Sequence, residues 1–233
     1  MNENGLFQDC IQVAGVIDAD EAALLLEADV GLLGFPLRLP VNTEDLSEAE
    51  AAVLMRALHP PAAGVLITYL DDAAEIVGFA RALGAGIVQL HGDVTAAELD
   101  RLRVLAPGLR VIKSLVVGLH SGQRLTEMVE TLGSRVDAFI TDTFDPSTGA
   151  SGATGKTHDW SVSRELVVCS SRPVILAGGL TPANVRAAIL AVGPAGVDVH
   201  TGVEGPDGRK DREQVRRFVA EARAGFAEMA ARR

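Results

Sequence analysis

A stretch near the C-terminus decides the fold: residues 173–200 read PVILAGGLTPANVRAAILAVGPAGVDVH. Its two short apolar runs, Pro173–Ala177 and Gly196–His200, are typical of buried strands because β-branched residues favour extended backbone. Between them Thr181–Val192 has helical spacing, with Pro182 at the first helical position, where proline is well tolerated. A strand, a helix and a second strand in this order predict two parallel strands joined by a crossover helix.

The same alternation runs through the whole chain. Apolar runs predict eight strands, near Ile11–Gly15, Val30–Gly34, Gly64–Thr68, Ile87–Leu90, Arg110–Ser114, Ala138–Thr141, Pro173–Ala177 and Gly196–His200. Amphipathic segments predict helices over Asp18–Glu27, Ser47–Leu58, Asp71–Leu83, Thr95–Leu105, Ser121–Leu132, Ser161–Val168, Thr181–Val192 and Asp211–Ala230. Strict alternation favours a parallel sheet closed into a single-domain α/β (βα)8 TIM barrel over residues 1–233. An open doubly wound sheet would need a glycine fingerprint after the first strand, where only Gly15 stands.

The composition restricts the class of protein and its partners. Hydrophobic residues make up 48% of the 233 residues and aromatic residues 4%, which predicts an aliphatic core. A net charge of -10 argues against nucleic acid and anionic membranes as partners. The chain has neither an apolar run of transmembrane length nor a basic N-terminal region, so we expect a cytoplasmic protein. Its two cysteines, Cys10 and Cys169, form no metal or redox motif, and we expect neither a metal nor a cofactor.

Small residues follow the last two predicted strands. The seventh strand runs into Gly178-Gly179 and the eighth into Thr201-Gly202. The loops after strands seven and eight of such barrels often bind phosphate through backbone N–H groups. Taken singly, each glycine is explained by a turn of the chain, but the pair of turns predicts that Gly178, Gly179, Thr201 and Gly202 hold the phosphate of a small phosphorylated sugar.

Two ionisable residues at strand ends are candidates for catalysis. Asp142 follows the sixth strand, where a carboxyl group can act as a general acid or base. The Gly-rich stretch Thr143–His158 comes directly after it and is long enough to predict a mobile lid. Lys113 ends the fifth strand and could form a Schiff base, although a packing or salt-bridging lysine explains it equally well.

Four further residues stand near strand ends and are candidates for substrate contact. Gln89 and His91 lie at the end of the fourth strand, where a histidine is more often structural than catalytic. His200 lies beside the predicted phosphate site and is, with Asp142 and Lys113, a third candidate for catalysis. Arg38, in the loop after the second strand, could bind a carboxylate in a bidentate manner or could simply be solvated.

Four blocks of sequence together resemble the phosphoribosylanthranilate isomerase family of tryptophan biosynthesis. They are VQLHGD at 88–93, TDT at 141–143 with GKTHDW at 155–160, LAGGLTPANV at 176–185, and VDV at 197–199 with TGVE at 201–204 and a closing KD at 210–211. The resemblance implies a (βα)8 barrel that performs an Amadori rearrangement of an N-phosphoribosyl arylamine. It also implies Asp142 as the general acid and the phosphate on the two small-residue turns.

The chain departs from the family in the first third of the sequence. The family's first strand reads Lys-x-Cys-Gly and its cysteine is the base, whereas this chain has Gln12-Val13-Ala14-Gly15. Cys10 lies four residues earlier, about 13 Å from Ala14 along an extended strand, and cannot replace the thiol. The family's Ser-x-Arg element, which holds the anthranilate carboxylate, is missing after the second strand, although Arg38 lies nearby. His200 stands where the family usually has a small residue.

Three hypotheses remain open from the sequence. The first is an isomerase for a phosphoribosyl amine with an altered base and aglycone site. The second is a phosphosugar lyase or aldol-type enzyme using Lys113, and the third is a non-catalytic phosphosugar-binding paralogue. Within the first, we expect a poor phosphoribosylanthranilate isomerase whose turnover Ala14→Cys would raise, because Ala14 cannot accept a proton. The competing interpretation is that His200 or another residue at a strand end has taken over as the base. The sequence is compatible with a homodimer and does not identify the aglycone.

Overall fold

Eight parallel strands close into a barrel in the computed structural model, which describes residues 5–40, 44, 46–145, 150–151 and 159–232. The strands are β1 (Cys10–Ala14), β2 (Leu32–Pro36), β3 (Ala63–Thr68), β4 (Ile87–Leu90), β5 (Arg110–Val117), β6 (Ala138–Asp145), β8 (Val174–Leu176) and β9 (Gly196–Val199). Each pairs in parallel with its neighbour in chain order, β9 with β1 and β5 with β6 included, so the ring has no free edge. The single-domain (βα)8 barrel predicted from the sequence is confirmed.

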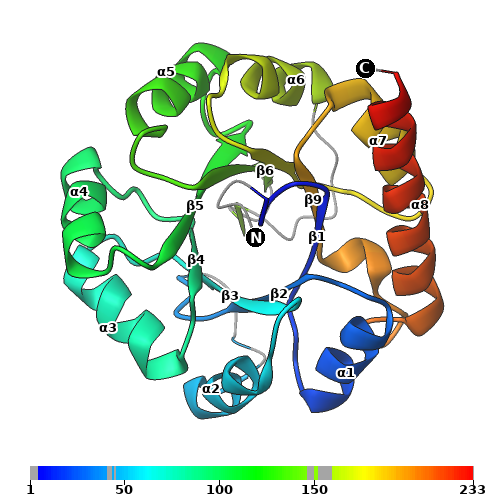
Figure 1. The fold of residues 1–233 in the computed structure, drawn as a ribbon, viewed down its shortest axis with the longest axis horizontal. Coiled ribbons are helices and arrows are strands. Elements are labelled where there is room, and N and C mark those ends of the chain that lie inside the picture. The colour runs from blue at the N-terminus through cyan, green and yellow to red at the C-terminus, as the bar shows by residue number, and fades with distance from the viewer. Residues whose placement is uncertain (1–4, 41–43, 45, 146–149, 152–158, 233) are drawn as a thin grey trace.

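Helices surround the ring of strands (Figure 1). They are α1 (Ala19–Glu27), α2 (Glu48–Ala57), α3 (Ala73–Leu83), α4 (Ala96–Leu105), α5 (Gly122–Leu132), α6 (Trp160–Cys169), α7 (Val185–Val192) and α8 (Arg212–Ala231), with a 3-10 turn, η1, over Thr201–Val203. Side-chain caps explain most starts: Asp18 accepts from the Glu21 N–H, and Ser47 forms a reciprocal capping box with Glu50. None of the helices in the described ranges is long and apolar enough to cross a membrane.

The apolar core forms two layers because alternate residues of each strand face opposite sides. An inner cluster inside the barrel contains Ile112, Ile140 and Ile175, and an outer cluster under the helices contains Val111, Leu115 and Phe139. The N-terminal segment crosses the centre of the ring in Figure 1, and Phe7 from this segment belongs to the inner cluster. Enzymes with this fold carry their active sites at the C-terminal ends of the strands.

Several predicted boundaries were wrong by a few residues. β2 starts at Leu32 rather than Val30, because α1 is followed by a turn in which Val30 bonds back to Leu25. The seventh helix starts at Val185 rather than Thr181, because Thr181–Asn184 forms a turn in which the Thr181 N–H donates to Asn184 Oδ1.

The largest difference lies after the sixth strand. β5 and β6 continue to Val117 and Asp145, beyond the predicted Ser114 and Thr141, because they pair with each other up to Val117 and Thr143. β6 then pairs antiparallel with a two-residue strand, β7 (Ala150–Ser151). The stretch expected to be wholly irregular therefore contains strand pairing. The prediction of a lid concerns mainly 146–149 and 152–158, which lie outside the described residues.

Candidate active site

A chain of buried polar side chains crosses the barrel interior. Nε2 of Gln12 on β1 donates to Oε1 of Gln89 on β4 at 2.8 Å, and Nε2 of Gln89 lies 2.8 Å from Nε2 of His91. Because the amide nitrogen can only donate, the ring nitrogen accepts and the proton of a neutral His91 resides on Nδ1. Nδ1 lies 4.0 Å from Oδ2 of Asp142. The network thus fixes the tautomer of His91 and directs an N–H toward the Asp142 carboxyl group.

His91 is held in its neutral form. Burial, together with the charge of Lys113, lowers the pKa of His91 to about 3. Its ring also packs against Tyr69, with the ring centroids 5.2 Å apart. A neutral imidazole with a fixed N–H is suited to orienting a carboxyl group or a substrate oxygen, and poorly suited to accepting a proton. Gln89 and His91 therefore do lie near Asp142, with Gln89 bonded to His91 and the buried Nδ1 of His91 without a hydrogen-bond partner among the described residues.

Asp142 lies on β6 with the inward-facing parity of Ile140 and is 8% exposed. Its Oδ1 accepts the backbone N–H of Thr143 at 2.8 Å. Burial raises the pKa of Asp142 to about 7, against the opposing effect of that hydrogen bond. A carboxyl group that titrates near neutral pH can donate a proton in one step and accept it in the next.

A second buried carboxyl group, Asp198 on β9, was not expected at the site from the sequence. It is 9% exposed, and burial and the charge of Asp142 raise its pKa to about 7. The side chain of Gln12 hydrogen-bonds to it. Strand parity explains its direction: Val197 and Val199 belong to the outer cluster, so Asp198 between them must face inward.

The end of β1 offers no proton acceptor, and His200 packs against it. Ala14 lies in the inner cluster and is 5% exposed. A Cβ built on Gly15 would lie 2.1 Å from Nε2 of His200, so the imidazole fills the space above this turn. The same Nε2 is 3.5 Å from Oε1 of Glu204. Burial and the charge of Lys210 lower the pKa of His200 to about 3, so its ring is neutral.

The turn after β8 has a backbone that favours glycine. Gly178 and Gly179 have φ values of 99° and 61°, in the left-handed region. Asn184 fixes the turn, because its Nδ2 donates to the Gly179 carbonyl at 3.0 Å while its Oδ1 accepts from the Thr181 N–H at 2.7 Å.

The turn after β9 lies directly against the turn after β8. A Cβ built on Gly202 would lie 1.8 Å from the carbonyl oxygen of Leu180, so the two backbones approach where only a glycine fits. The structure therefore brings together Gly178, Gly179, Thr201 and Gly202 on adjacent turns at the C-terminal end of the barrel.

Lys113 is not brought into this group. It shares the parity of Val111 and Leu115, which face the helices, and its Nζ donates to the carbonyl oxygens of Leu90 and Ser114 at 3.2 and 2.9 Å. Burial lowers its pKa to about 8, while the charge of Asp93 acts in the opposite direction.

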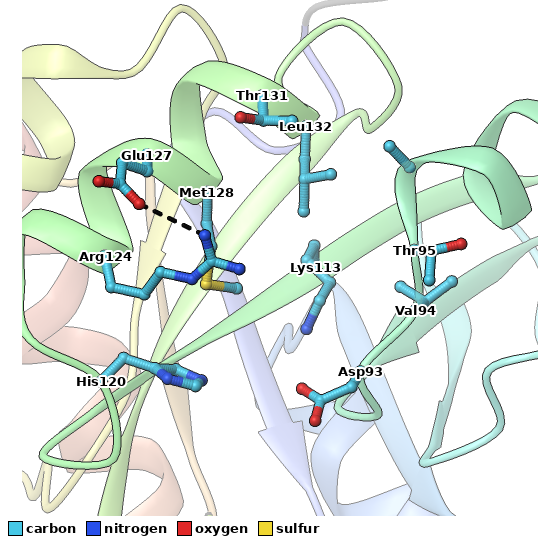
Figure 2. Close-up of a pocket in the computed structure, with 11 residues that line it drawn as sticks. Asp93, Val94, Thr95, Lys113, His120, Arg124, Glu127, Met128, Thr131 and Leu132 are labelled. Carbon is cyan, nitrogen blue, oxygen red and sulfur yellow. Dashed lines mark hydrogen bonds and ion pairs between the residues drawn. The ribbon is translucent and has the colours of Figure 1, made fainter.

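Figure 2 shows the surroundings of Lys113. Its side chain projects into a cavity of about 500 Å³ between α4 and α5, with Asp93 on one side and His120, Arg124 and Met128 on the other. Because the amine points away from the barrel interior, the geometry gives no support to Schiff-base chemistry on a sugar held by the two turns. The sequence did not reveal this, since a parallel strand buried on both faces lacks the alternation that shows which residues point inward.

Arg38 is also directed elsewhere. Its Nε lies 2.8 Å from Oε1 of Glu48, and its guanidinium group stacks over the ring of Phe79, 3.8 Å from the ring centroid. The predicted carboxylate-binding arginine is thus paired with a carboxylate of the protein itself. Within the described ranges, no three His, Cys, Asp or Glu side chains gather as metal ligands would.

Comparisons with known proteins agree with this geometry. Residues 37–221 match the family model of N-(5'-phosphoribosyl)anthranilate (PRA) isomerase. The chain belongs to this isomerase family. It is 38% identical to N-(5'-phosphoribosyl)anthranilate isomerase 2 of Methanosarcina mazei, covering 93% of this chain and 95% of the relative. It is 40% identical to the isomerase of Haloferax volcanii, covering 91% and 92% of the two chains.

Solved structures of the isomerase family have the same fold. The phosphoribosyl anthranilate isomerase of Thermotoga maritima superposes with a TM-score of 0.77 at 27% identity, covering 92% of this chain and 98% of that one. A structure of phosphoribosyl anthranilate isomerase in complex with reduced 1-(o-carboxyphenylamino)-1-deoxyribulose 5-phosphate gives a TM-score of 0.75 at 26% identity, with the same coverage of both chains. The family resemblance drawn from the four sequence blocks is confirmed, and the family's isomerases act in tryptophan biosynthesis.

Proposed function

We propose that this chain catalyses an Amadori-type isomerisation of an N-(5'-phosphoribosyl) arylamine, using Asp142 as the general acid. The observation that carries the proposal is the placement of Asp142: a buried carboxyl group with a pKa raised to about 7, inside the mouth of a barrel of the isomerase family. At neutral pH a substantial fraction of this group is protonated, as a general acid must be.

The first chemical step uses that proton. The acid transfers it to the ring oxygen of the furanose, the C1–O bond breaks, and the nitrogen lone pair forms the C1=N iminium bond. The Nδ1 of His91 lies 4.0 Å from Oδ2 of Asp142, so a small movement would let its N–H stabilise the carboxylate that results.

The phosphate would be held by the two touching turns. The left-handed backbone at Gly178 and Gly179 lets N–H groups approach a ligand without a side chain between them. The turn carrying Thr201 and Gly202 packs against this one and adds a second set of donors. Support for this placement comes from the general position of phosphate sites in such barrels, after the last two strands.

The aglycone half of the site differs from the pattern that the resemblance implies. The loop after β2 has no Ser-x-Arg element, and Arg38 is paired with Glu48 and stacked on Phe79. A substrate carboxylate would have to break that ion pair to gain the arginine. We therefore infer that this chain tolerates arylamines other than anthranilate.

Turnover of N-(5'-phosphoribosyl)anthranilate, followed by the change in anthranilate fluorescence, tests the proposal. We expect the native chain to isomerise it and Asp142→Asn to lose about 10²–10⁴-fold in kcat, the usual contribution of a general acid. Binding of the reduced product analogue should persist in this variant, because the amide keeps the size of the carboxyl group.

Binding without turnover by the native chain would instead favour a non-catalytic paralogue. Borohydride trapping of a substrate adduct that disappears in Lys113→Met would revive the lyase hypothesis.

The oligomeric state remains a proposal as well. A structural relative at 26% identity is described as the monomers of a dimeric isomerase of Thermotoga maritima. We propose a homodimer for this chain, and light scattering on the purified protein, with a mass of one chain or of two, decides it.

A further inference from the structure

The second half of the reaction needs a base that Ala14 cannot supply. After ring opening, a proton must leave C2 of the sugar, and the acceptor must lie within about 3 Å of that proton's carbon or reach it through one water. Cys10 is excluded, because it lies at the far end of β1 and burial raises the pKa of its thiol to about 12. The two histidines of the site are neutral with pKa values of about 3, too weakly basic for this step.

Asp198 has the geometry of an acceptor. Continuing the pairing of Ile175 with Ile140 and with Gly196 by two residues places Ala177 beside both Asp142 and Asp198. The two carboxyl groups therefore stand on alternate strands, face the barrel interior and have only the small Ala177 side chain between them. In a closed barrel, inward-facing side chains of alternate strands share one layer.

The bonding of Asp198 leaves capacity for a ligand. Its Oδ1 is buried and has no hydrogen-bond partner among the residues described, while the Gln12 amide binds the carboxyl group. A buried carboxylate oxygen without a donor is costly in free energy, and such groups cluster where a substrate completes the bonding. Asp198 lies two residues deeper in the barrel than Ala14, because it pairs with Gln12, which comes two residues before Ala14 on β1.

We propose that the carboxylate of Asp198 removes the C2 proton of the iminium intermediate, in place of a thiolate at position 14. This assignment rests on the proposed isomerase function. Asp198 gains the proton, the electron pair of the C2–H bond forms the C1=C2 double bond, and the C=N π electrons return to nitrogen. The protonated Asp198 then transfers its proton to C1, and the enol O–H proton passes to the Asp142 carboxylate. This gives the amino ketone and restores both carboxyl groups to their starting states.

The charges around Asp198 fit this role. Burial and the charge of Asp142, two strands away, raise the pKa of Asp198 to about 7, while Lys210 opposes the rise and Cys10 faces it as a neutral thiol. Two coupled carboxyl groups of this kind share one proton near neutral pH, so one serves as acid while the other serves as base. Gln12 stands where the family resemblance has a lysine, so no ammonium group on β1 depresses the basicity of Asp198.

Three variants measured with N-(5'-phosphoribosyl)anthranilate test the assignment. Asp198→Asn should lower kcat by about 10²–10⁴-fold, with binding of the reduced product analogue retained. Gln12→Lys should lower the pKa of Asp198 and move the low-pH limb of kcat to lower pH. Ile87→Val is the control, because Ile87 is a buried apolar residue of the inner cluster at the N-terminal end of β4, so its change should leave kcat unchanged.

The outcomes separate the assignment from the proposed function. Native turnover together with full activity of Asp198→Asn, or an unmoved pH limb in Gln12→Lys, would overturn the role of Asp198 and leave the isomerase standing. An inactive native chain would overturn both. Deuterium at C2 gives a further check, since a primary isotope effect should appear or increase in Asp198→Asn as proton removal becomes rate-limiting.

Discussion

Replacement of Gly202 by alanine tests the phosphate site through a contact that the structure defines closely. The added methyl would lie 1.8 Å from the Leu180 carbonyl oxygen, and Cβ contacts below 3.0 Å are essentially never observed. Gly202 itself has a backbone conformation open to alanine, so the severe conflict is with the Leu180 carbonyl group, beside a tight contact of 3.2 Å with Cγ2 of Val199. Because both partners are backbone, the turns after β8 and β9 must separate by more than about 1 Å.

The expected effect follows from that separation. A displacement of about 1 Å in a positioning element can cost about 10²-fold in catalysis, and overpacking costs about 1–3 kcal/mol in folding stability. We expect kcat/KM of Gly202→Ala to fall by about 10²-fold, mainly through a higher KM, since the phosphate lies away from the reacting carbons. Inhibition by inorganic phosphate and ribose 5-phosphate should weaken in parallel.

Steady-state kinetics and thermal melting of Gly202→Ala and Gly108→Ala measure both effects. Gly108 is the matched control, because a Cβ added there meets nothing within 4 Å. If Gly202→Ala folds and binds phosphate ligands as the native chain does, the phosphate lies elsewhere and the two turns have only a structural role.

Three further predictions follow from the contacts of the site. Because the proton acceptor is assigned to Asp198, Ala14→Cys should change turnover of N-(5'-phosphoribosyl)anthranilate by less than about 10-fold, and a gain of about 10²-fold or more would return the base to position 14. Because Arg38 is paired with Glu48, the phosphoribosyl amine of aniline, which lacks the carboxylate, should have a kcat/KM within about 10-fold of the anthranilate compound; a loss equal to that of a buried charged hydrogen bond, about 1.5–3 kcal/mol or more, would show that Arg38 swings to the substrate. Since burial raises the pKa of Asp142 to about 7, the folded state binds this proton more tightly than the unfolded state, so stability falls as pH rises from the ordinary aspartate pKa through about 7. Asp142→Asn should therefore melt at a higher temperature than the native chain at pH 8 and lose this advantage near pH 4, and equal melting temperatures at pH 8 would contradict the raised pKa.

Much of the fold could be predicted because its signals are local. Apolar runs of strand length, and caps such as Asp18, Ser47 and Thr95 at the starts of helices, depend on neighbours a few residues away. Eight repeats of that pattern leave a closed barrel as the simple solution, and the barrel in turn places Gly178 and Gly202 at its C-terminal end. The family motifs added Asp142 as the candidate for the acid.

The direction in which the side chains of the site point could be predicted less well than the fold. Parallel strands of a barrel are buried on both sides, so their sequences lack the polar–apolar alternation that would show which residues point inward. Lys113 therefore reads as a residue of the barrel mouth, although its parity with Val111 and Leu115 turns it toward the helices. In the sequence, Asp198 is one residue of the VDV block at 197–199. Its place between two outward-facing valines directs it inward, toward the layer of Asp142.

The sequence by itself determined that this chain is an aliphatic (βα)8 barrel of the isomerase family with small-residue turns after its last two strands and no thiol at position 14. Only the tertiary structure decided which ionisable groups share the interior: Asp142, Asp198 and His91 inside, Lys113 in a separate cavity, and Arg38 tied to Glu48. The physical reason is that closure of the sheet sets register and facing through pairings between distant strands. Burial by those same pairings then raises the pKa of two carboxyl groups to near neutrality.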